Sequence, residues 1–205
     1  MSFWSEHVLS RAIDAVCSGR GPSKHRRELI PLAEGRVLDV GVGSGLNLPH
    51  ADRARVERWV GLDPSPALLA KARVRAAEVG FDVELLEGVA ERLPFPDESF
   101  DTLVITYTFC SVDDPAVVAQ ELARVVRRGG KLLFAEHGVA QTESSRALQR
   151  SLEPTWKKVA GGCTLQRDIV RSLTDTGRFV IERTKLREDF PKWMSTVRSG
   201  VAVAE

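Results

Sequence analysis

The sequence feature that most constrains this chain is a short apolar run that leads directly into three alternating glycines. Residues 37–40 are typical of a buried strand, and they are followed by Gly41, Gly43 and Gly45. Glycine carries no Cβ, so the backbone can turn sharply at these positions and a ligand can approach its N–H groups closely. In an open α/β sheet, ligands bind at the carboxyl ends of the strands. The pattern therefore predicts a ligand site where this strand ends.

A carboxylate at the end of the next predicted strand narrows the kind of ligand. Asp63 directly follows the strand predicted at residues 56–62, where it can accept hydrogen bonds from both hydroxyls of a ribose. The dinucleotide motif G-x-G-x-x-G requires a glycine where this chain has Leu46. Together with Asp39, which precedes the loop, these residues predict a nucleotide-type cofactor. They leave NAD and S-adenosylmethionine as alternatives, and the glycine spacing disfavours NAD.

Strand-like and helix-like segments alternate along the chain. Helices are predicted to begin at Ser65-Pro66 and at Asp114-Pro115, because the side-chain oxygen caps the first turn and proline lacks the N–H that would be left unpaired there. Gly129-Gly130 is predicted to end the second of these helices. Such alternation predicts an α/β fold, a mostly parallel sheet with helices on both faces. The predicted strands are 37–40, 56–62, 82–86, 100–107, 131–135, 179–183 and 200–204, and the predicted helices include 67–79, 143–152 and 165–176.

Composition and charge exclude several classes of protein. The 205 residues carry a net charge of +1, so the basic excess typical of nucleic-acid-binding proteins is absent. The longest stretch without a charged side chain, residues 40–51, is too short to span a bilayer, and the N-terminus does not resemble a signal peptide. We therefore expect a single-domain cytoplasmic protein that binds no nucleic acid and has no transmembrane segment. Cys17, Cys110 and Cys163 are odd in number and widely spaced, which indicates neither a disulfide framework nor a zinc cluster, so no metal is predicted.

Four motifs in order carry a resemblance to a known family. DVGVGSG, GLDPSPALLAKAR, ERLPFPDESFD and LARVVRRGGKLLFAEH resemble a class I S-adenosylmethionine-dependent methyltransferase of the ubiquinone/menaquinone-methyltransferase-like type, methyltransferase type 11. The resemblance covers residues 37–137. Four flanking or interleaved segments, KHRREL, TFCSV, AEH and LEPTWKKVAGGC, are similar to the methyltransferase-like alkyl-thiol methyltransferases. The resemblance implies a Rossmann-like fold with a seven-stranded, mostly parallel sheet and S-adenosylmethionine as cofactor.

The resemblance also implies roles for individual residues. The three glycines cradle the methionine and ribose parts of the cofactor, and Asp39 faces its amino-acid end. The family usually has aspartate where this chain has Val89, so the backbone near Ala90, or Glu91, would have to bind the adenine. The implied cofactor-binding set is Asp39, Gly41, Gly43, Gly45, Asn47, Asp63 (ribose hydroxyls), Pro64 and Ser65 (adenine), Val89, Ala90 and Glu91 (adenine edge), and Thr106 and Tyr107 (methionyl group).

Candidate groups for the acceptor side follow the fourth and fifth predicted strands. His137 is the candidate base or acceptor-orienting group, and Tyr107 is a candidate proton-transfer group or aromatic lid. Ordinary packing is the favoured interpretation of Cys110 and Cys163. For His25, Arg26 and Arg27 the favoured interpretation is a solvated helix face. Residues 1–35 are interpreted as a helical lid, 36–136 as the cofactor-binding core and 137–205 as substrate-side helices and last strands. An amphipathic helix is predicted from Phe3, Trp4, Val8, Leu9, Ile13 and Val16, for which packing or a lid is favoured over peripheral membrane contact.

The function predicted from the sequence is methyl transfer from S-adenosylmethionine to a small-molecule acceptor, with a thiol as the leading hypothesis. A quinone ring carbon and a phospholipid amine are alternative acceptors. A regulatory protein that binds the cofactor without turnover is a further alternative. An NAD-dependent oxidoreductase is disfavoured by Leu46. The sequence predicts no oligomeric state.

Overall fold

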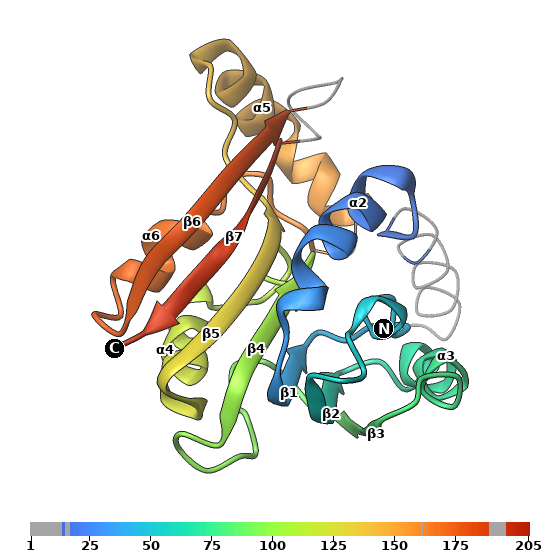
Figure 1. The fold of residues 1–205 in the computed structure, drawn as a ribbon. Helices are drawn as coiled ribbons and strands as arrows, with labels where there is room; N and C mark the ends of the chain where they lie inside the picture. The colour runs from blue at the N-terminus through green and yellow to red at the C-terminus, as the bar shows by residue number, and fades with distance from the viewer. Residues whose placement is uncertain (1–13, 15–16, 161, 189–195) are drawn as a thin grey trace.

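The computed structural model describes residue 14 and residues 17–160, 162–188 and 196–205. Its centre is one seven-stranded sheet in the order β3-β2-β1-β4-β5-β7-β6 (Figure 1). All neighbouring strands are parallel except that β7 is antiparallel to both β5 and β6. The predicted Rossmann-like α/β fold with a seven-stranded, mostly parallel sheet is therefore confirmed. The strands are β1 Gly35–Val40, β2 Val56–Asp63, β3 Asp82–Glu87, β4 Phe100–Thr106, β5 Val126–His137, β6 Phe179–Glu188 and β7 Thr196–Ala204.

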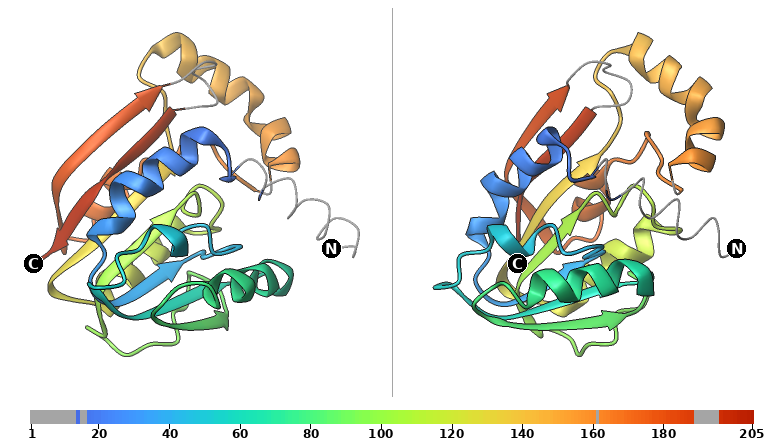
Figure 2. Two further views of the ribbon diagram at one scale, coloured as in Figure 1. Left: turned by 45° about the vertical axis from the view of Figure 1, so that its right-hand side comes forward. Right: turned by 90° about the vertical axis from the view of Figure 1, so that its right-hand side faces the viewer.

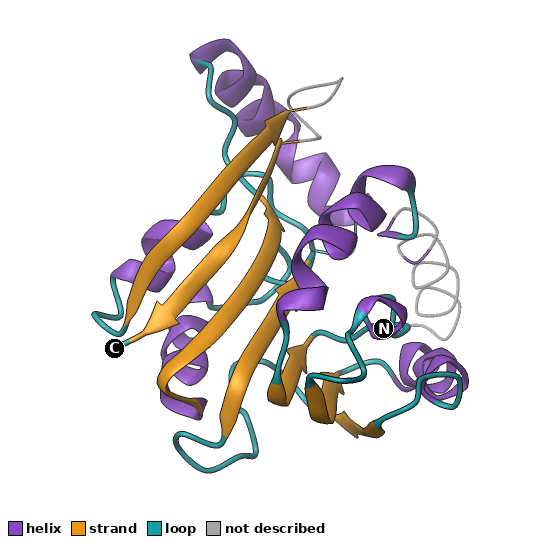
Figure 3. Cartoon of the chain, in the orientation of Figure 1, coloured by secondary structure: helices purple, strands orange, loops and turns teal. Residues whose placement is uncertain are grey.

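Helices cover both faces of the sheet because successive side chains of a central strand point to opposite faces. Leu38 on β1 belongs to a core cluster that contains residues of α4 (Pro115–Val125) and α6 (Ile169–Thr174). Its neighbour Val37 belongs to a second cluster, which contains residues of α2 (Arg20–Leu29) and of the short 3-10 helix η1 (Ile30–Leu32). Figures 1 and 3 show α2 in front of the sheet and α4 and α6 behind it.

The predicted helix starts are confirmed by their caps. The hydroxyl of Ser65 accepts a hydrogen bond from the Leu68 amide, and α3 (Pro66–Ala76) begins with proline. The carboxylate of Asp114 accepts from the amides of Ala116 and Val117 at the start of α4. Each cap places its helix directly after a loop at the carboxyl end of a strand, which is where the ligand site is expected.

The prediction that Gly129-Gly130 ends a helix is wrong. The helix α4 ends at Val125, and Val126 is already extended and paired with Phe100 in the sheet. A Cβ on Gly130 would lie 2.9 Å from the carbonyl oxygen of Asp101, so this glycine permits two strands to approach each other closely. Gly130 therefore serves close packing between two strands of the sheet and does not end a helix.

The last third of the chain differs from the prediction in its boundaries. Helix α5 (Glu143–Val159) continues through Pro154 and is longer than predicted, whereas α6 is shorter and begins after the capping residue Asp168. Strands β6 and β7 extend beyond the predicted ranges because they pair along their length as an antiparallel hairpin, with Glu188 opposite Thr196. Figure 2 shows α5 beyond the carboxyl end of β5.

Two expectations concern the N-terminus and the membrane. The predicted amphipathic helix with Phe3, Trp4, Val8, Leu9, Ile13 and Val16 lies outside the described residues. Within the described part of the chain, none of the helices combines the length and the apolar character that crossing a bilayer requires.

Candidate cofactor and acceptor site

A cavity of about 510 Å³ lies at the carboxyl ends of β1, β2 and β4. Its wall combines the loop after β1, the turn after β2, the segment after β3 and the residues that follow β4. The structure thus brings most of the predicted cofactor residues together around one space. The predicted residues that line it are Gly41, Gly43, Asn47, Asp63, Pro64, Ser65, Val89, Ala90, Glu91, Thr106 and Tyr107. Asp39, Gly45 and His137 are not among the lining residues.

The three glycines of the loop serve different purposes, although all have positive φ. A Cβ on Gly41 would lie 2.1 Å from the side chain of Thr108, so the loop approaches β4 too closely for any side chain. Gly43 has no atom nearer than 4.0 Å to a Cβ, which leaves its backbone open toward the cavity. A Cβ on Gly45 would lie 3.0 Å from Leu48, which explains why Gly45 packs behind the loop rather than lining the cavity.

Asp63 is held rigidly at the cavity wall. One carboxylate oxygen accepts a hydrogen bond of 2.9 Å from the amide of Gly43, and the other accepts one of 2.9 Å from the amide of Ser65. The side chain is buried, and burial raises its pKa above the usual value. Each oxygen retains a second lone pair, so the carboxylate can still accept hydrogen bonds from two vicinal hydroxyls of a ligand.

Asp39 lies beneath the glycine loop and supports Asn47. Both of its oxygens accept hydrogen bonds of 3.0 Å from the Asn47 amide nitrogen. Burial raises the pKa of Asp39 to about 7. The same Asn47 nitrogen donates to the hydroxyl of Thr106, and its amide oxygen accepts from Nε of Arg26 at 3.0 Å. Asp39 therefore reaches the cavity through Asn47, whereas the resemblance placed it at the amino-acid end of the cofactor.

The prediction of a solvated face for His25 and Arg26 is wrong, although Arg27 is exposed as expected. Both buried residues lie on the face of α2 that packs toward the sheet, three and four positions before the buried Leu29. The helical spacing to this apolar residue was the signal that could have identified them. Arg26 lines the cavity, and it donates to the carbonyl oxygen of Cys17 as well as to Asn47.

Tyr107 is a wall of the cavity in a strained backbone conformation. Its φ is 57°, a region that bulky residues rarely adopt and that costs about 1–3 kcal/mol. The amide of Tyr107 donates to the carbonyl of Ala135 at 2.9 Å, and its hydroxyl lies 2.6 Å from Nδ1 of His25. The Arg26 guanidinium lies over the ring, 5.4 Å from its centroid. Burial raises the pKa of the Tyr107 hydroxyl, so this group stays protonated.

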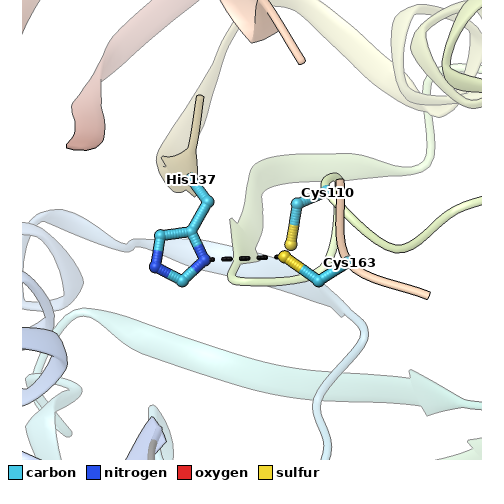
Figure 4. A group of neighbouring side chains, drawn as sticks. All are labelled: Cys110, His137 and Cys163. Atoms are coloured by element: carbon cyan, nitrogen blue, oxygen red, sulfur yellow. Dashed lines mark hydrogen bonds between the residues drawn. The ribbon is translucent and has the colours of Figure 1, made fainter. Parts of the chain in front are cut away.

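His137 lies outside the cavity, against the edge of the Tyr107 ring. The two ring centroids are 5.4 Å apart, and the planes are nearly perpendicular. Its Nδ1 is 3.7 Å from the sulfur of Cys163 (Figure 4). The sequence placed His137 correctly at the end of a strand, but the structure places it behind the ring of Tyr107 and not in the wall of the cavity.

Glu136 and Asp14 are functional candidates that the sequence analysis missed. The Glu136 carboxylate is fully buried and accepts from the amides of Thr108 at 2.9 Å and of Cys110 at 3.3 Å, which fixes the turn after β4. Burial raises its pKa to about 7. Asp14 lines the cavity, accepts a hydrogen bond from the hydroxyl of Ser44 and pairs with Lys71. The acid at the end of β5 was a visible signal for Glu136; no comparable signal exists for Asp14.

Comparisons with known proteins identify the family. Residues 38–134 match the family described as "Methyltransferase domain". The chain is 32% identical over 170 residues to thiol S-methyltransferase TMT1B of Homo sapiens, and the alignment covers 76% of this chain and 68% of that protein. This chain belongs to the class I S-adenosylmethionine-dependent methyltransferases.

Other relatives of this methyltransferase differ in their named acceptors. It is 40% identical over 121 residues to phosphatidylethanolamine N-methyltransferase of Cereibacter sphaeroides, and it spans 58% of the length of that relative. The solved structure of a methyltransferase from Thermotoga maritima, described as a possible histamine N-methyltransferase, superposes with a TM-score of 0.67. That likeness covers 97% of this chain and 98% of the other at 24% identity, and it establishes the fold.

The arrangement is suited to positioning an adenosyl group. The methyltransferase presents an open backbone at Gly43, a buried carboxylate at Asp63 and a buried cation at Arg26 around one cavity. The open backbone allows a ligand to approach closely, the carboxylate can accept hydrogen bonds from a pair of hydroxyls, and the cation can pair with a carboxylate of the ligand. Glu91 also lines the cavity, but one of its oxygens already accepts from the amide of Asp113 at 2.9 Å.

Proposed function

We propose that this methyltransferase transfers the methyl group of S-adenosylmethionine to the sulfur of a small-molecule thiol. The cofactor's ribose hydroxyls would be bound by Asp63, its carboxylate by Arg26, and its methionyl part would lie along the glycine loop beside Thr106 and Tyr107. Asn47 would hold Arg26 and the loop in place through the contacts described above. Residues Asp14 and Cys17 would belong to a lid over the cofactor.

Methyl transfer needs alignment more than it needs proton transfer. The acceptor displaces the sulfonium in line, the bond from methyl to the sulfonium sulfur breaks as the new bond forms, and the positive charge disappears. Holding both reactants in this geometry can contribute about 7–11 kcal/mol. A cavity closed by Tyr107, Asp14 and Cys17 would exclude water and favour this alignment.

The observation that supports a thiol concerns the bases at the cavity wall. Among the described residues, neither histidine nor lysine lines it. Asp63, Asp14 and Glu91 line the cavity, and each already accepts hydrogen bonds or pairs with a cation. A fourth acid, Asp113, also lines the cavity, and it is exposed to solvent. A thiol has a pKa of about 8.5 and ionises with little assistance. An alkylammonium group is a weaker acid, and it must lose its proton before the amine can accept a methyl group. The cavity therefore favours a thiolate acceptor.

A direct comparison of acceptors tests the proposal. The purified chain would be incubated with S-adenosylmethionine and, separately, with a small alkyl thiol, a quinol and vesicles that contain phosphatidylethanolamine. We expect a methyl thioether in the first reaction, detected by mass spectrometry together with S-adenosylhomocysteine. If methylated quinol or methylated lipid amine forms and no thioether does, the thiol proposal is wrong and the acceptor is one of the alternatives. Tight cofactor binding without transfer in every reaction would indicate a regulatory protein.

A further inference from the structure

Two cysteines and a histidine from three separate segments meet at one point beside the Tyr107 wall. Cys110 lies in the turn after β4, His137 is the last residue of β5, and Cys163 follows α5. Their sulfur and nitrogen atoms all lie within 4.8 Å of one another. Figure 4 shows both sulfurs and the Nδ1 edge of the imidazole directed toward a common centre. Neither cysteine is in a disulfide.

The spacing of these atoms resembles that of ligands around a tetrahedral metal ion. Zinc binds cysteine sulfur at about 2.3 Å and histidine nitrogen at about 2.0–2.1 Å, so a sulfur and a nitrogen on one tetrahedral ion lie roughly 3.6 Å apart. The sulfur of Cys163 and Nδ1 of His137 are 3.7 Å apart. The other two distances between donor atoms are at most 4.8 Å, which exceeds by no more than about one ångström the roughly 3.6–3.8 Å expected around a tetrahedral zinc ion.

Backbone hydrogen bonds fix the positions of the segments that carry the two cysteines. The amide of Thr164, next to Cys163, donates to the carbonyl of Cys110 at 2.8 Å. The amide of Cys110 donates to the buried carboxylate of Glu136, the neighbour of His137. Both cysteine side chains are buried. The three donors are thus fixed by hydrogen bonds between the segments that carry them, which is the preorganisation that a metal site requires.

We propose that Cys110, His137 and Cys163 bind one zinc ion, with a fourth position open to water or to another exogenous ligand. Thiolate and imidazole donors select zinc over magnesium and calcium, which prefer oxygen. Binding would release the two thiol protons to solvent and leave the oxidation state of the metal unchanged. The ion would fasten the connection between β5 and α6 to the turn after β4, next to the ring of Tyr107.

Metal uptake by the full chain tests this site independently of methyl transfer. The reduced protein would be titrated with Co²⁺, which reports tetrahedral thiolate ligation through its visible and near-ultraviolet absorption, and then with Zn²⁺ as competitor. We expect one ion per chain, with strong absorption bands that zinc removes. Cys163→Ser should abolish these bands. Cys17→Ser is the matched control, because it removes the third cysteine, and it should retain them.

Thermal unfolding separates loss of the site from loss of the fold. In the wild type and in Cys17→Ser, zinc should raise the unfolding temperature, whereas Cys163→Ser should fold with an unfolding temperature that does not respond to zinc. Cys110→Ser should behave like Cys163→Ser. The proposal is overturned if the reduced wild type takes up no metal, or if Cys163→Ser and Cys110→Ser retain the tetrahedral cobalt spectrum. Failure of methyl transfer to a thiol would leave this result unaffected.

Discussion

The two sides of the site are built in different ways. The cofactor side consists of the glycine loop, Asp63 and Ser65, which follow one another within a short stretch of chain and are positioned by two neighbouring strands. The other side, which we call the acceptor side, is where the methionyl end of the cofactor would meet the acceptor. It combines Arg26 of α2, Tyr107 after β4 and the cluster completed by Cys163, which are distant in sequence. Local backbone requirements therefore determine the first side, and tertiary packing determines the second.

The largest expected effect tests the cofactor side. Asp63→Ala should lower the affinity for S-adenosylhomocysteine by about 100-fold or more, because two hydrogen bonds to a charged group contribute roughly 1.5–3 kcal/mol each. Isothermal titration calorimetry measures this change. Glu57→Ala, which removes an exposed acid from the same strand, is the control and should bind normally. If Asp63→Ala binds with unchanged affinity, Asp63 does not bind the ribose hydroxyls. Local sequence would then not determine the cofactor side.

A smaller effect should arise on the acceptor side, from Arg26. Arg26→Met keeps most of the apolar stem but removes the cation that contacts Asn47 and the Cys17 carbonyl. We expect affinity for S-adenosylhomocysteine to fall about 10–100-fold, since hydrogen bonds to charged groups contribute about 1.5–3 kcal/mol. Arg27→Met, at the exposed neighbouring position, should bind as the wild type does. If the two variants bind equally well, Arg26 has no role in the cofactor site.

The sequence was sufficient for features that depend on local chemistry. The strand before Gly41, the caps at Ser65 and Asp114 and the strand-end position of Asp63 each follow from residue types within a few positions of one another. Gly130 shows the limit of such reasoning, because the same residue type ends helices and permits close strand packing. Only the position of the Asp101 carbonyl distinguishes the two roles.

The acceptor side could be predicted only in part, for a geometric reason. Cys110 follows β4 and His137 is the last residue of the adjacent parallel strand β5, so their proximity was implied once the two strands were known to be neighbours. The position of Cys163 depends on the direction of α5, which precedes it, and that direction is set by packing that no local pattern encodes. The positive φ of Tyr107 was equally hidden, since nothing in its neighbours requires that conformation.

The smallest expected effect concerns Asp39, which lies beneath both sides. Its pKa is about 7 in the folded protein and near 3.8 when unfolded, so the folded state binds the extra proton. The free energy of unfolding should therefore fall as pH rises from about 4 to 7 and then level off. Asp39→Asn, a neutral amide of the same shape, should flatten this dependence and be more stable than the wild type by about 1–2 kcal/mol at pH 8.

Urea unfolding at several pH values between 5 and 8 measures the effect of Asp39→Asn. Part of the slope should remain in the variant, because Glu136 also has its pKa raised to about 7 and contributes with the same sign. Glu57→Gln, at an exposed position of β2, should retain the full wild-type slope. If Asp39→Asn also retains the full wild-type slope, the carboxylate of Asp39 is ionised in the folded protein. The Arg26 cation would then stabilise this carboxylate more than burial destabilises it. The acceptor side would then set the charge state of a residue beneath the cofactor loop, and the two sides would not be independent.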